Sequence, residues 1–385
     1  MKIVYCLPQI YKPGGIERIV ILKANYLASL GYDIHIITSE QFNKSIFYAY
    51  NKNIHFHDLS VNFSSTLSLP IIKRLIQKHQ LTKIYKRKLT KLLMKLKADI
   101  TISTFSHEAN ILPDIADNSI KIIETHFPKK HQKLMADTFN YPFFTKIAYY
   151  IKDWVEENII AKKYDQMVVL TSTDAQEWKK ITPNVIQIPN FITFNTEATS
   201  TVTNKRVLAV GHFSKIKAFE DLINIWALVK QKDINNAWIL SIIGCGEDLQ
   251  KIKDTIITLK VCNSVEILPP TDKIQQEYLS SSIYVSTSKY EGFPMVLLEA
   301  MQSGLPCIAF DCPNGPRDII TNNNDGFLVR PNDFNDFANK ILLLMNNDKK
   351  RIEMGKNAAI NIQRYSCDKI MKKWTYLFNN LIKDK

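Results

Sequence analysis

Short apolar stretches rich in Ile and Val alternate along the chain with longer segments whose apolar residues recur every three or four positions. The short stretches predict buried strands, and the longer segments predict amphipathic helices. Because the two alternate through most of the chain, the pattern predicts an α/β fold of parallel sheets covered by helices on both faces. The predicted strands are Lys2–Leu7, Asp33–Thr38, Ile54–Leu59, Asp99–Ser103, Ile120–Glu124, Gln166–Leu170 and Val185–Ile188, followed by Arg206–Gly211, Ala237–Ile243, Ser264–Leu268, Ile283–Ser286, Pro306–Phe310 and Gly326–Val329.

The predicted strands fall into two series separated by the polar, Thr-rich stretch 194–204. At 385 residues the chain also exceeds what one hydrophobic core normally supports. We therefore predict two Rossmann-like domains, residues 1–190 and 205–364, joined by a linker at 191–204. Apolar residues at helical spacing in 365–385 predict a closing helix.

The composition indicates a reduced, cytoplasmic protein. There is no run of about 18 consecutive apolar residues, and the first ten residues are too weakly apolar for a secretion signal. The six cysteines form no CxxC pair and have no His at zinc-ligand spacing, so neither a disulfide framework nor a metal site is expected. His55 and His57 alternate along a predicted strand without a metal-like partner.

Basic residues outnumber acidic ones, 50 to 37, and residues 1–200 hold 26 Lys and Arg against 17 Asp and Glu. The segment Lys73–Lys97 contains ten Lys or Arg and no acid, with leucines at spacings near three and four, which predicts one or two basic amphipathic helices. Two interpretations stay open: a solvated helix that packs its leucines on the sheet, or a surface that binds anionic lipid at the inner face of the cytoplasmic membrane. No helix-turn-helix, RNA-recognition or zinc-finger pattern supports nucleic-acid binding.

The segment 288–320 reads SKYEGFPMVLLEAMQSGLPCIAFDCPNGPRDII and carries two carboxylates eight positions apart, Glu291 and Glu299. A helix is predicted over Met295–Gln302, with a stop at Gly304. Unpaired N–H groups at such a helix start favour a diphosphate. By spacing alone, however, the pair equally fits one loop charge and one solvated helix charge.

The whole segment resembles the signature of retaining glycosyltransferases of family 4, within the glycosyl transferases group 1. The resemblance rests on the EGFP turn, the second Glu, the GLP turn after the helix and the later Gly315-Pro316 pair. It implies the GT-B fold: two Rossmann-like domains facing across a deep cleft, with the C-terminal helix crossing back onto the N-terminal domain. It also implies that Glu291 approaches the donor sugar as a catalytic residue and that Glu299 binds the nucleotide ribose. The residues implied to present their backbone to sugar and phosphate are Gly292, Phe293, Pro294, Met295 and Val296.

Three further turns resemble donor-binding segments of that family. Gly14 and Gly15, in the segment YKPGGIER, resemble the glycine-rich N-terminal loop of the family. A second segment, IIGCGEDLQ, resembles the turn that borders the nucleotide base. VGHFSKIKAF resembles the phosphate turn, with Lys217 as the implied main phosphate cation and catalytic residue. It departs from the family pattern because His212 stands where an Arg is expected and Ala218 replaces a glycine. The glycines of the last two turns are Gly211, Gly244 and Gly246.

His126 follows the predicted strand Ile120–Glu124, at the sheet edge where ligands of open α/β folds collect. A single His is often structural, but the resemblance implies that this one faces the transferred sugar as a catalytic residue. Lys129 and Lys130 come next in the sequence, and we interpret them as contacts for a phosphorylated or membrane-linked acceptor.

The resemblance implies transfer of a hexose or N-acetylhexosamine from a nucleoside diphosphate sugar, which we expect to be a UDP-sugar. It also implies that the configuration at the anomeric carbon is retained and that no metal or other cofactor is needed. The implied acceptor is a lipid-linked, lipopolysaccharide or capsule glycan in bacterial surface polysaccharide biosynthesis. Two alternatives stay open: a nucleotide-sugar epimerase on the same scaffold, and a non-catalytic protein that binds sugar nucleotides or membranes. The full GxGxxG and Walker patterns are absent, which argues against a dehydrogenase or an NTPase.

Overall fold

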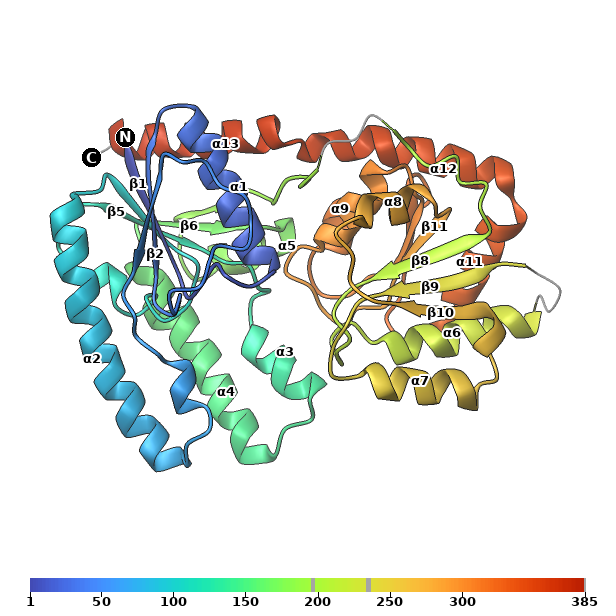
Figure 1. Cartoon of the computed structure of the whole chain (residues 1–385), viewed down its shortest axis with the longest axis horizontal. Coiled ribbons are helices and arrows are strands. Elements are labelled where there is room, and N and C mark those ends of the chain that lie inside the picture. Colours follow the sequence, from blue (N-terminus) through green and yellow to red (C-terminus); the bar gives the residue numbers. More distant parts are fainter. Residues whose placement is uncertain (195–197, 233–236, 384–385) are drawn as a thin grey trace.

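The computed structural model describes residues 1–385 apart from 195–197, 233–236 and 384–385. It contains two parallel sheets, with strand orders β3-β2-β1-β4-β5-β6-β7 and β10-β9-β8-β11-β12-β13. Both sheets follow the Rossmann order, in which the chain reverses direction across the sheet after its third strand. Figure 1 shows the two domains beside each other, and the predicted α/β fold with two Rossmann-like domains is confirmed.

The observed strands agree with the predicted ones to within two residues at either end. They are β1 (Lys2–Leu7), β2 (Asp33–Thr38), β3 (Ile54–Asp58), β4 (Ile100–Ser103), β5 (Ile120–Glu124), β6 (Gln166–Val169), β7 (Val185–Gln187), β8 (Arg206–Val210), β9 (Ile239–Ile243), β10 (Val265–Leu268), β11 (Ile283–Ser286), β12 (Cys307–Phe310) and β13 (Gly326–Val329).

The α-helices occupy the connections between the strands. They are α1 (Gly15–Ser29), α2 (Ile71–Leu96), α3 (His131–Thr138), α4 (Phe143–Val155), α5 (Ser172–Lys179), α6 (Phe219–Lys232), α7 (Leu249–Thr258), α8 (Ile274–Leu279), α9 (Met295–Gln302), α10 (Pro316–Ile319), α11 (Phe334–Asn346), α12 (Asp348–Asn361) and α13 (Cys367–Lys383). The basic segment is one helix, α2, and the predicted helix over Met295–Gln302 is α9. Within the described part of the chain, no helix is both long and apolar enough to cross a membrane.

The predicted linker 191–204 includes residues 195–197, and the predicted closing segment 365–385 includes residues 384–385. Both of these pieces lie outside the described residues. The last strand of the first sheet ends at Gln187, and the first strand of the second sheet begins at Arg206. The domain boundaries themselves stay a prediction.

Strand β1 shows how the first sheet is buried on both faces. Ile3 and Tyr5 belong to the apolar cluster on the side of α1 and α13, whereas Val4 and Cys6 belong to the cluster on the side of α2. Successive side chains of a strand point to opposite faces, so a strand covered on both faces must be apolar throughout. This is why β1 reads as an apolar run from Ile3 to Leu7.

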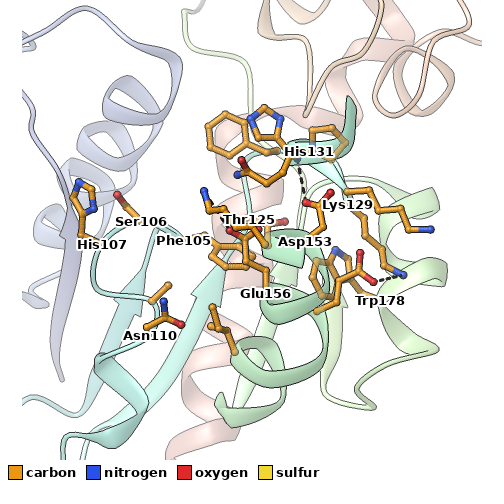
Figure 2. Close-up of a pocket in the computed structure, with 18 of the residues that line it drawn as sticks. Phe105, Ser106, His107, Asn110, Thr125, Lys129, His131, Asp153, Glu156 and Trp178 are labelled. Atoms are coloured by element: carbon orange, nitrogen blue, oxygen red, sulfur yellow. Dashed lines mark hydrogen bonds and ion pairs between the residues drawn. The ribbon is translucent and has the colours of Figure 1, made fainter. Parts of the chain in front are cut away.

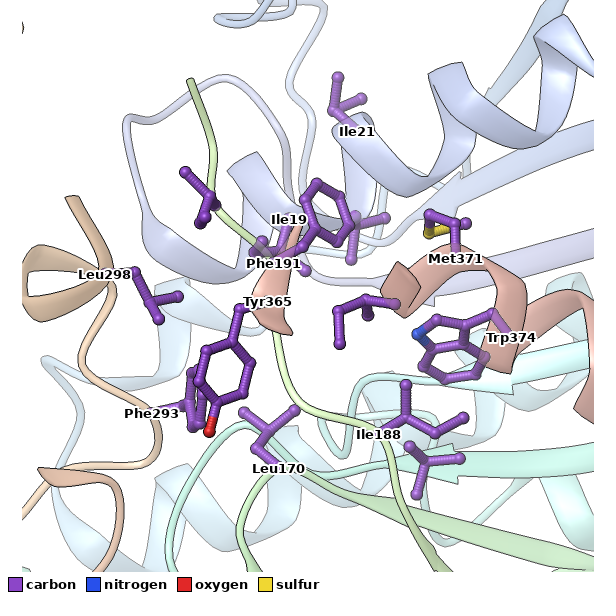
Figure 3. Packing of buried hydrophobic residues seen from close by; sticks show 14 of the residues in the cluster. Ile19, Ile21, Leu170, Ile188, Phe191, Phe293, Leu298, Tyr365, Met371 and Trp374 are labelled. Atoms are coloured by element: carbon purple, nitrogen blue, oxygen red, sulfur yellow. The ribbon is translucent and has the colours of Figure 1, made fainter. Parts of the chain in front are cut away.

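Helix α13 crosses back over the N-terminal domain, as the resemblance implied (Figure 1). Trp374 and Met371 are fully buried in the same cluster as Ile19 of α1 and Phe293 of the loop before α9 (Figure 3). The apolar core is therefore continuous from the N-terminal sheet through α13 to the C-terminal domain.

A buried ion pair lies under α13. Lys23 of α1 contacts Glu124 at the end of β5, and each side chain is 1% exposed. The ammonium of Lys23 lies 4.5 Å from the ring centroid of Trp374. Burial lowers the pKa of Lys23, although the charge of Glu124 opposes that shift. The pair joins the first helix, the end of a central strand and the crossing helix.

Candidate active site

The two domains meet around a cavity of about 220 Å³ at the carboxyl ends of both sheets. In open α/β sheets these ends, next to the point where the strand order reverses, are where ligands bind. The N-terminal domain contributes Gly15 after β1 and His126 after β5, and the C-terminal domain contributes the loop between β11 and α9. Predicted residues that line the cavity are Gly15, His126, Glu291, Gly292, Phe293 and Met295. Segments up to 280 positions apart in the sequence are thus brought together.

Glu291 and Lys217 form an ion pair at the edge of this cavity. Nζ of Lys217 lies 2.5 Å from Oε1 of Glu291, and the side chains are 23% and 11% exposed. The turn after β8 is anchored because Thr287 donates from Oγ1 to the carbonyl of Lys217 at 3.2 Å. An ammonium held in this way is positioned to neutralise an anionic group, and the carboxylate beside it can accept hydrogen bonds from hydroxyls.

Ala218 shows what the departure from a glycine means. Its φ is +51°, in the left-handed region, and its N–H donates to the carbonyl of Ser214 at 3.1 Å. An L-residue in this conformation costs roughly 1–2 kcal/mol, which glycine avoids. The turn therefore keeps its shape with an alanine at the strained position, next to the candidate phosphate cation.

Glu299 is buried in α9 and is bound on three sides. Its Oε1 accepts from Arg18 at 2.7 Å and from Thr193 at 2.9 Å, and its Oε2 accepts from Tyr278 at 3.1 Å. Arg18 belongs to α1, so this contact joins the two domains. The role of Glu299 at the ribose stays a prediction. Arg18 was not expected as its partner, and its only sequence signal is its position in the first turn of α1, just after the paired glycines.

His126 is buried at the domain interface. Burial lowers its pKa to about 4, although the charge of Glu124 opposes the shift. His126 is therefore neutral near pH 7 and can act there as a hydrogen-bonding group. A Cβ at Gly292 would lie 2.0 Å from the carbonyl oxygen of His126, so only glycine fits where the EGFP turn meets the other domain.

Three buried polar atoms around the cavity lack a hydrogen-bond partner among the described residues: Nε2 of His126, Nδ1 of His131 and Oη of Tyr290. His131 stacks on Phe127 with centroids 4.4 Å apart and meets the edge of Tyr290 at 5.8 Å. Buried polar groups in folded proteins nearly always have partners, so these atoms are available to hydrogen-bond water or a polar ligand. His131 and Tyr290 were missed because nothing in their local sequence marks them.

The structure does not bring every predicted residue to the cavity. His212 is exposed, and its Nε2 lies 3.0 Å from Oε2 of Glu247. Gly244 and Gly246 are explained by packing, since a Cβ at Gly244 would lie 1.9 Å from the carbonyl oxygen of Gly211, and one at Gly246 would meet the backbone of Phe213. Their roles at phosphate and base stay predictions. Gly211, Lys217 and Glu299 also lie outside the cavity lining. So do Gly14, whose carbonyl accepts from Tyr48, the N-cap residue Pro294, and the half-buried Val296.

A second cavity, of about 330 Å³, lies in the N-terminal domain (Figure 2). It continues the first, because Phe127, Pro128 and His131 line both. Its charged lining is mixed, and consists of Lys78, Lys129, Lys130 and Lys152 together with Asp153, Glu156 and Glu157. Three more buried atoms without a hydrogen-bond partner belong to residues that line it: Oγ1 of Thr125, Oε1 of Glu157 and Nε1 of Trp178.

The acidic wall of this second cavity has an unusual backbone. Helix α4 runs directly into a π-helical turn at Glu156–Ile160, a feature that is frequent at functional sites. Burial raises the pKa of Glu156 to about 6, with the charge of Lys152 opposing the shift. Two connected cavities with unpaired polar groups can hold two reactants side by side.

One group of possible metal ligands was not expected from the sequence, and whether the chain holds a metal stays a prediction. Asp33, His35 and His55 offer ligand atoms that all lie within 4.8 Å of one another, so His55 does have metal-like partners. The sequence could not show this, because the group depends on the pairing of β2 with β3. It lies at the amino ends of these strands, away from the cavities.

Residues 193–360 match the family model described as glycosyl transferases group 1. The chain is also 28% identical over 380 residues to an uncharacterized glycosyltransferase of Haemophilus influenzae, covering 97% of this chain and 98% of that protein. These matches support a glycosyltransferase.

Two further comparisons agree. The poly(ribitol-phosphate) alpha-N-acetylglucosaminyltransferase of Staphylococcus aureus is 35% identical over 228 residues, 57% of this chain and 45% of that protein. A crystal structure of a TarM mutant from S. aureus, with Fondaparinux, alpha-GlcNAc-glycerol and UDP, superimposes with a TM-score of 0.78 at 19% identity, covering 98% and 99% of the two chains. The fold of the chain is thus GT-B, as the resemblance implied.

Proposed function

We propose that the chain is a retaining, metal-independent glycosyltransferase of family 4 that transfers a hexose or N-acetylhexosamine from a UDP-sugar to a lipid-linked, lipopolysaccharide-type or capsule glycan. The observation that carries the proposal is the Lys217–Glu291 pair at the cavity between the domains. UDP is bound by the structural neighbour, and the S. aureus relative is named for alpha-N-acetylglucosaminyl transfer to poly(ribitol-phosphate). These similarities support a nucleotide-sugar donor and a bacterial glycan acceptor.

In the proposed mechanism, Lys217 and the start of α9 stabilise the departing diphosphate, and this positive charge takes the place of a metal. Glu291 accepts hydrogen bonds from the sugar hydroxyls, and neutral His126 donates to or accepts from the transferred sugar. The acceptor hydroxyl oxygen forms the new bond to the anomeric carbon while the bond to the diphosphate breaks on the same face. The acceptor proton passes to the departing phosphate oxygen. Catalysis then consists mainly of positioning and charge stabilisation.

We assign the acceptor to the second cavity. It opens into the donor cavity at His131, and its lysines suit a phosphorylated acceptor. Trp178 and Phe105 offer ring faces, and the unpaired atoms of Thr125 and Glu157 offer hydrogen bonds to a sugar. This cavity therefore supplies the kind of groups that a glycan with phosphate needs.

The proposal is tested by product stereochemistry. Purified protein in EDTA is given UDP-glucose, UDP-galactose, UDP-N-acetylglucosamine or UDP-N-acetylgalactosamine together with lipid-linked and lipopolysaccharide-core acceptors. One of these sugars should yield UDP and an α-linked product, read from the anomeric proton coupling by NMR. A β-linked product would refute retention, activity only after Mg²⁺ addition would refute metal independence, and epimerisation of the donor without transfer would favour the epimerase alternative.

We also propose that α2 and α4 contact an anionic membrane. Lys78 of α2 and Lys152 of α4 line the same cavity, so the helices are neighbours, and both project from the first domain (Figure 1). Leu89 and Leu93 of α2 are buried on the sheet, as the packing interpretation expects, but Leu75 and other apolar residues near the start of the helix are exposed. The exposed apolar residues of the two helices include Ile72, Leu75, Ile76, Phe143, Phe144, Ile151 and Trp154. Apolar side chains beside many lysines fit an anionic lipid surface.

Replacing Phe143 and Phe144 together with Ser should lower binding to vesicles of 30% phosphatidylglycerol at least about tenfold, because inserting one such ring contributes more than about 1.4 kcal/mol. Their exposed fractions are 72% and 83%, so the fold should not change. Vesicle flotation measures the effect. The matched control is Ile257→Ser with Ile360→Ser, which removes equally exposed side chains from the other domain. Equal binding by both double variants and the wild type, or no vesicle binding at all, would refute the membrane contact.

A further inference from the structure

Three histidines and one aspartate gather on the outer strands of the first sheet, β2 and the edge strand β3. His35 and His55 are direct partners in the parallel pairing, and their rings stack with centroids 4.8 Å apart. His57 follows two positions after His55, and Asp33 lies two positions before His35, so alternation places all four on one face.

The possible ligand atoms converge on one point. Nε2 of His35 lies 3.1 Å from Oδ1 of Asp33, and Nε2 of His55 lies 3.8 Å from the same oxygen. All three ligand positions lie within 4.8 Å of one another. In a tetrahedral zinc site with bonds of about 2.0–2.1 Å, ligand atoms lie about 3.3 Å apart. A small rotation of the exposed His55 ring would bring the third atom to that spacing.

A second observation points to a ligand at this place. His35 is only 7% exposed, and its Nε2 lies 3.1 Å from Oδ1 of Asp33 in a geometry that makes no hydrogen bond, so this nitrogen has no hydrogen-bond partner among the described residues. Its other ring nitrogen, Nδ1, lies 2.9 Å from Nε2 of His57, and those two rings also stack. A partner on one nitrogen fixes the ring and directs the other nitrogen, as it does for histidines that bind metals. Buried polar atoms left without a partner need an explanation, and a cation supplies one.

We propose that Asp33, His35 and His55 bind a divalent transition metal of the zinc class, with His57 orienting His35. Imidazole nitrogens with one carboxylate suit Zn²⁺ and its neighbours, whereas Mg²⁺ prefers oxygen ligands. The side chains of Asp33 and His55 are 43% and 59% exposed, so water completes the coordination. Lys2 contacts the other carboxylate oxygen, Oδ2, at 3.4 Å, which leaves Oδ1 directed at the two histidines. The metal would join the edge strand to β2 and is separate from the proposed transfer reaction.

The test uses the full chain without an affinity tag, stripped with EDTA and then dialysed. Titration with Co²⁺ should give the visible absorption bands of a tetrahedral site. The bands should saturate at one equivalent of Co²⁺ and disappear when Zn²⁺ displaces the Co²⁺. Zn²⁺ should raise the thermal unfolding midpoint, and Mg²⁺ at the same concentration should not. Absence of the cobalt bands in the folded wild type would overturn the proposal.

Single substitutions test which residues bind the metal. His55→Ala and Asp33→Asn should each lower Co²⁺ affinity at least about 100-fold, and His57→Ala should lower it about 10- to 100-fold by releasing the His35 ring. His55→Ala changes an exposed side chain, so it should fold even if a change at His35 does not. The control is His79→Ala, an exposed histidine of α2 outside the group, which should leave the affinity unchanged. Equal affinity in all four variants would place the metal elsewhere and contradict the proposal.

Discussion

Glu291→Gln is expected to lower the rate of sugar transfer by about 100- to 1000-fold while the protein stays folded. The change keeps the size of the side chain but removes the charge that faces Lys217 at 2.5 Å and holds the sugar hydroxyls in the proposed mechanism. Loss of one positioned electrostatic contact in an active site typically has an effect of this size. Initial rates at saturating UDP-sugar measure it, and thermal unfolding reports the fold.

The matched control for this variant is Glu353→Gln, which neutralises an exposed carboxylate of α12 far from the cavities in sequence and fold. It should transfer sugar at the wild-type rate. A Glu291→Gln protein that keeps more than a tenth of the wild-type rate would show that this carboxylate has no central role, and the assignment of the site would fail.

Lys23→Met is expected to destabilise the protein by about 3–5 kcal/mol. The substitution leaves the carboxylate of Glu124 buried without its partner, and breaking a buried ion pair from one side has this typical effect. It also removes the ammonium from the face of Trp374, so the docking of α13 on the N-terminal domain should weaken. Urea unfolding followed by circular dichroism measures the loss.

The double variant Lys23→Met with Glu124→Gln should recover much of that stability, because no buried charge is left unpaired. An exposed ion pair provides the comparison. Lys180 contacts Glu177, and the two side chains are 67% and 40% exposed. Lys180→Met should lower the free energy of unfolding by less than about 1 kcal/mol. A loss below about 1 kcal/mol for Lys23→Met, or a double variant less stable than both single ones, would contradict this account of the core.

The fold could be predicted closely because each buried strand is a short run of branched apolar residues bounded by polar ones. That local pattern located the thirteen strands of the described residues to within two residues at either end. It left open whether the basic segment forms one helix or two. The segment contains no glycine or proline that would mark a break. In the structure α2 ends at Leu96, and its C-cap residue Lys97 adopts the left-handed conformation that is more common for glycine, so the stop has no clear sequence signal.

The site could be predicted only where it is built from consecutive residues. The turn around Glu291 is local and was recognised, and the structure places it at the cavity. The contact of Arg18 with Glu299 joins residues 281 positions apart, and it depends on how the domains meet. His131 and the pairing of His35 with His55 likewise depend on tertiary packing and strand register. Spacing along the chain carries no information about such contacts.

The central claim is that a nucleoside diphosphate sugar binds between the two domains. It is tested most directly by the thermal unfolding midpoint in EDTA with UDP, GDP, ADP or CMP, because a ligand that binds only the folded state raises the midpoint. At 100 times its dissociation constant, UDP should stabilise the protein by about 2.7 kcal/mol, and the Lys217→Ala variant should lose most of that shift. If none of the four nucleotides shifts the midpoint, the proposed donor site is wrong, and a non-catalytic role becomes the better account.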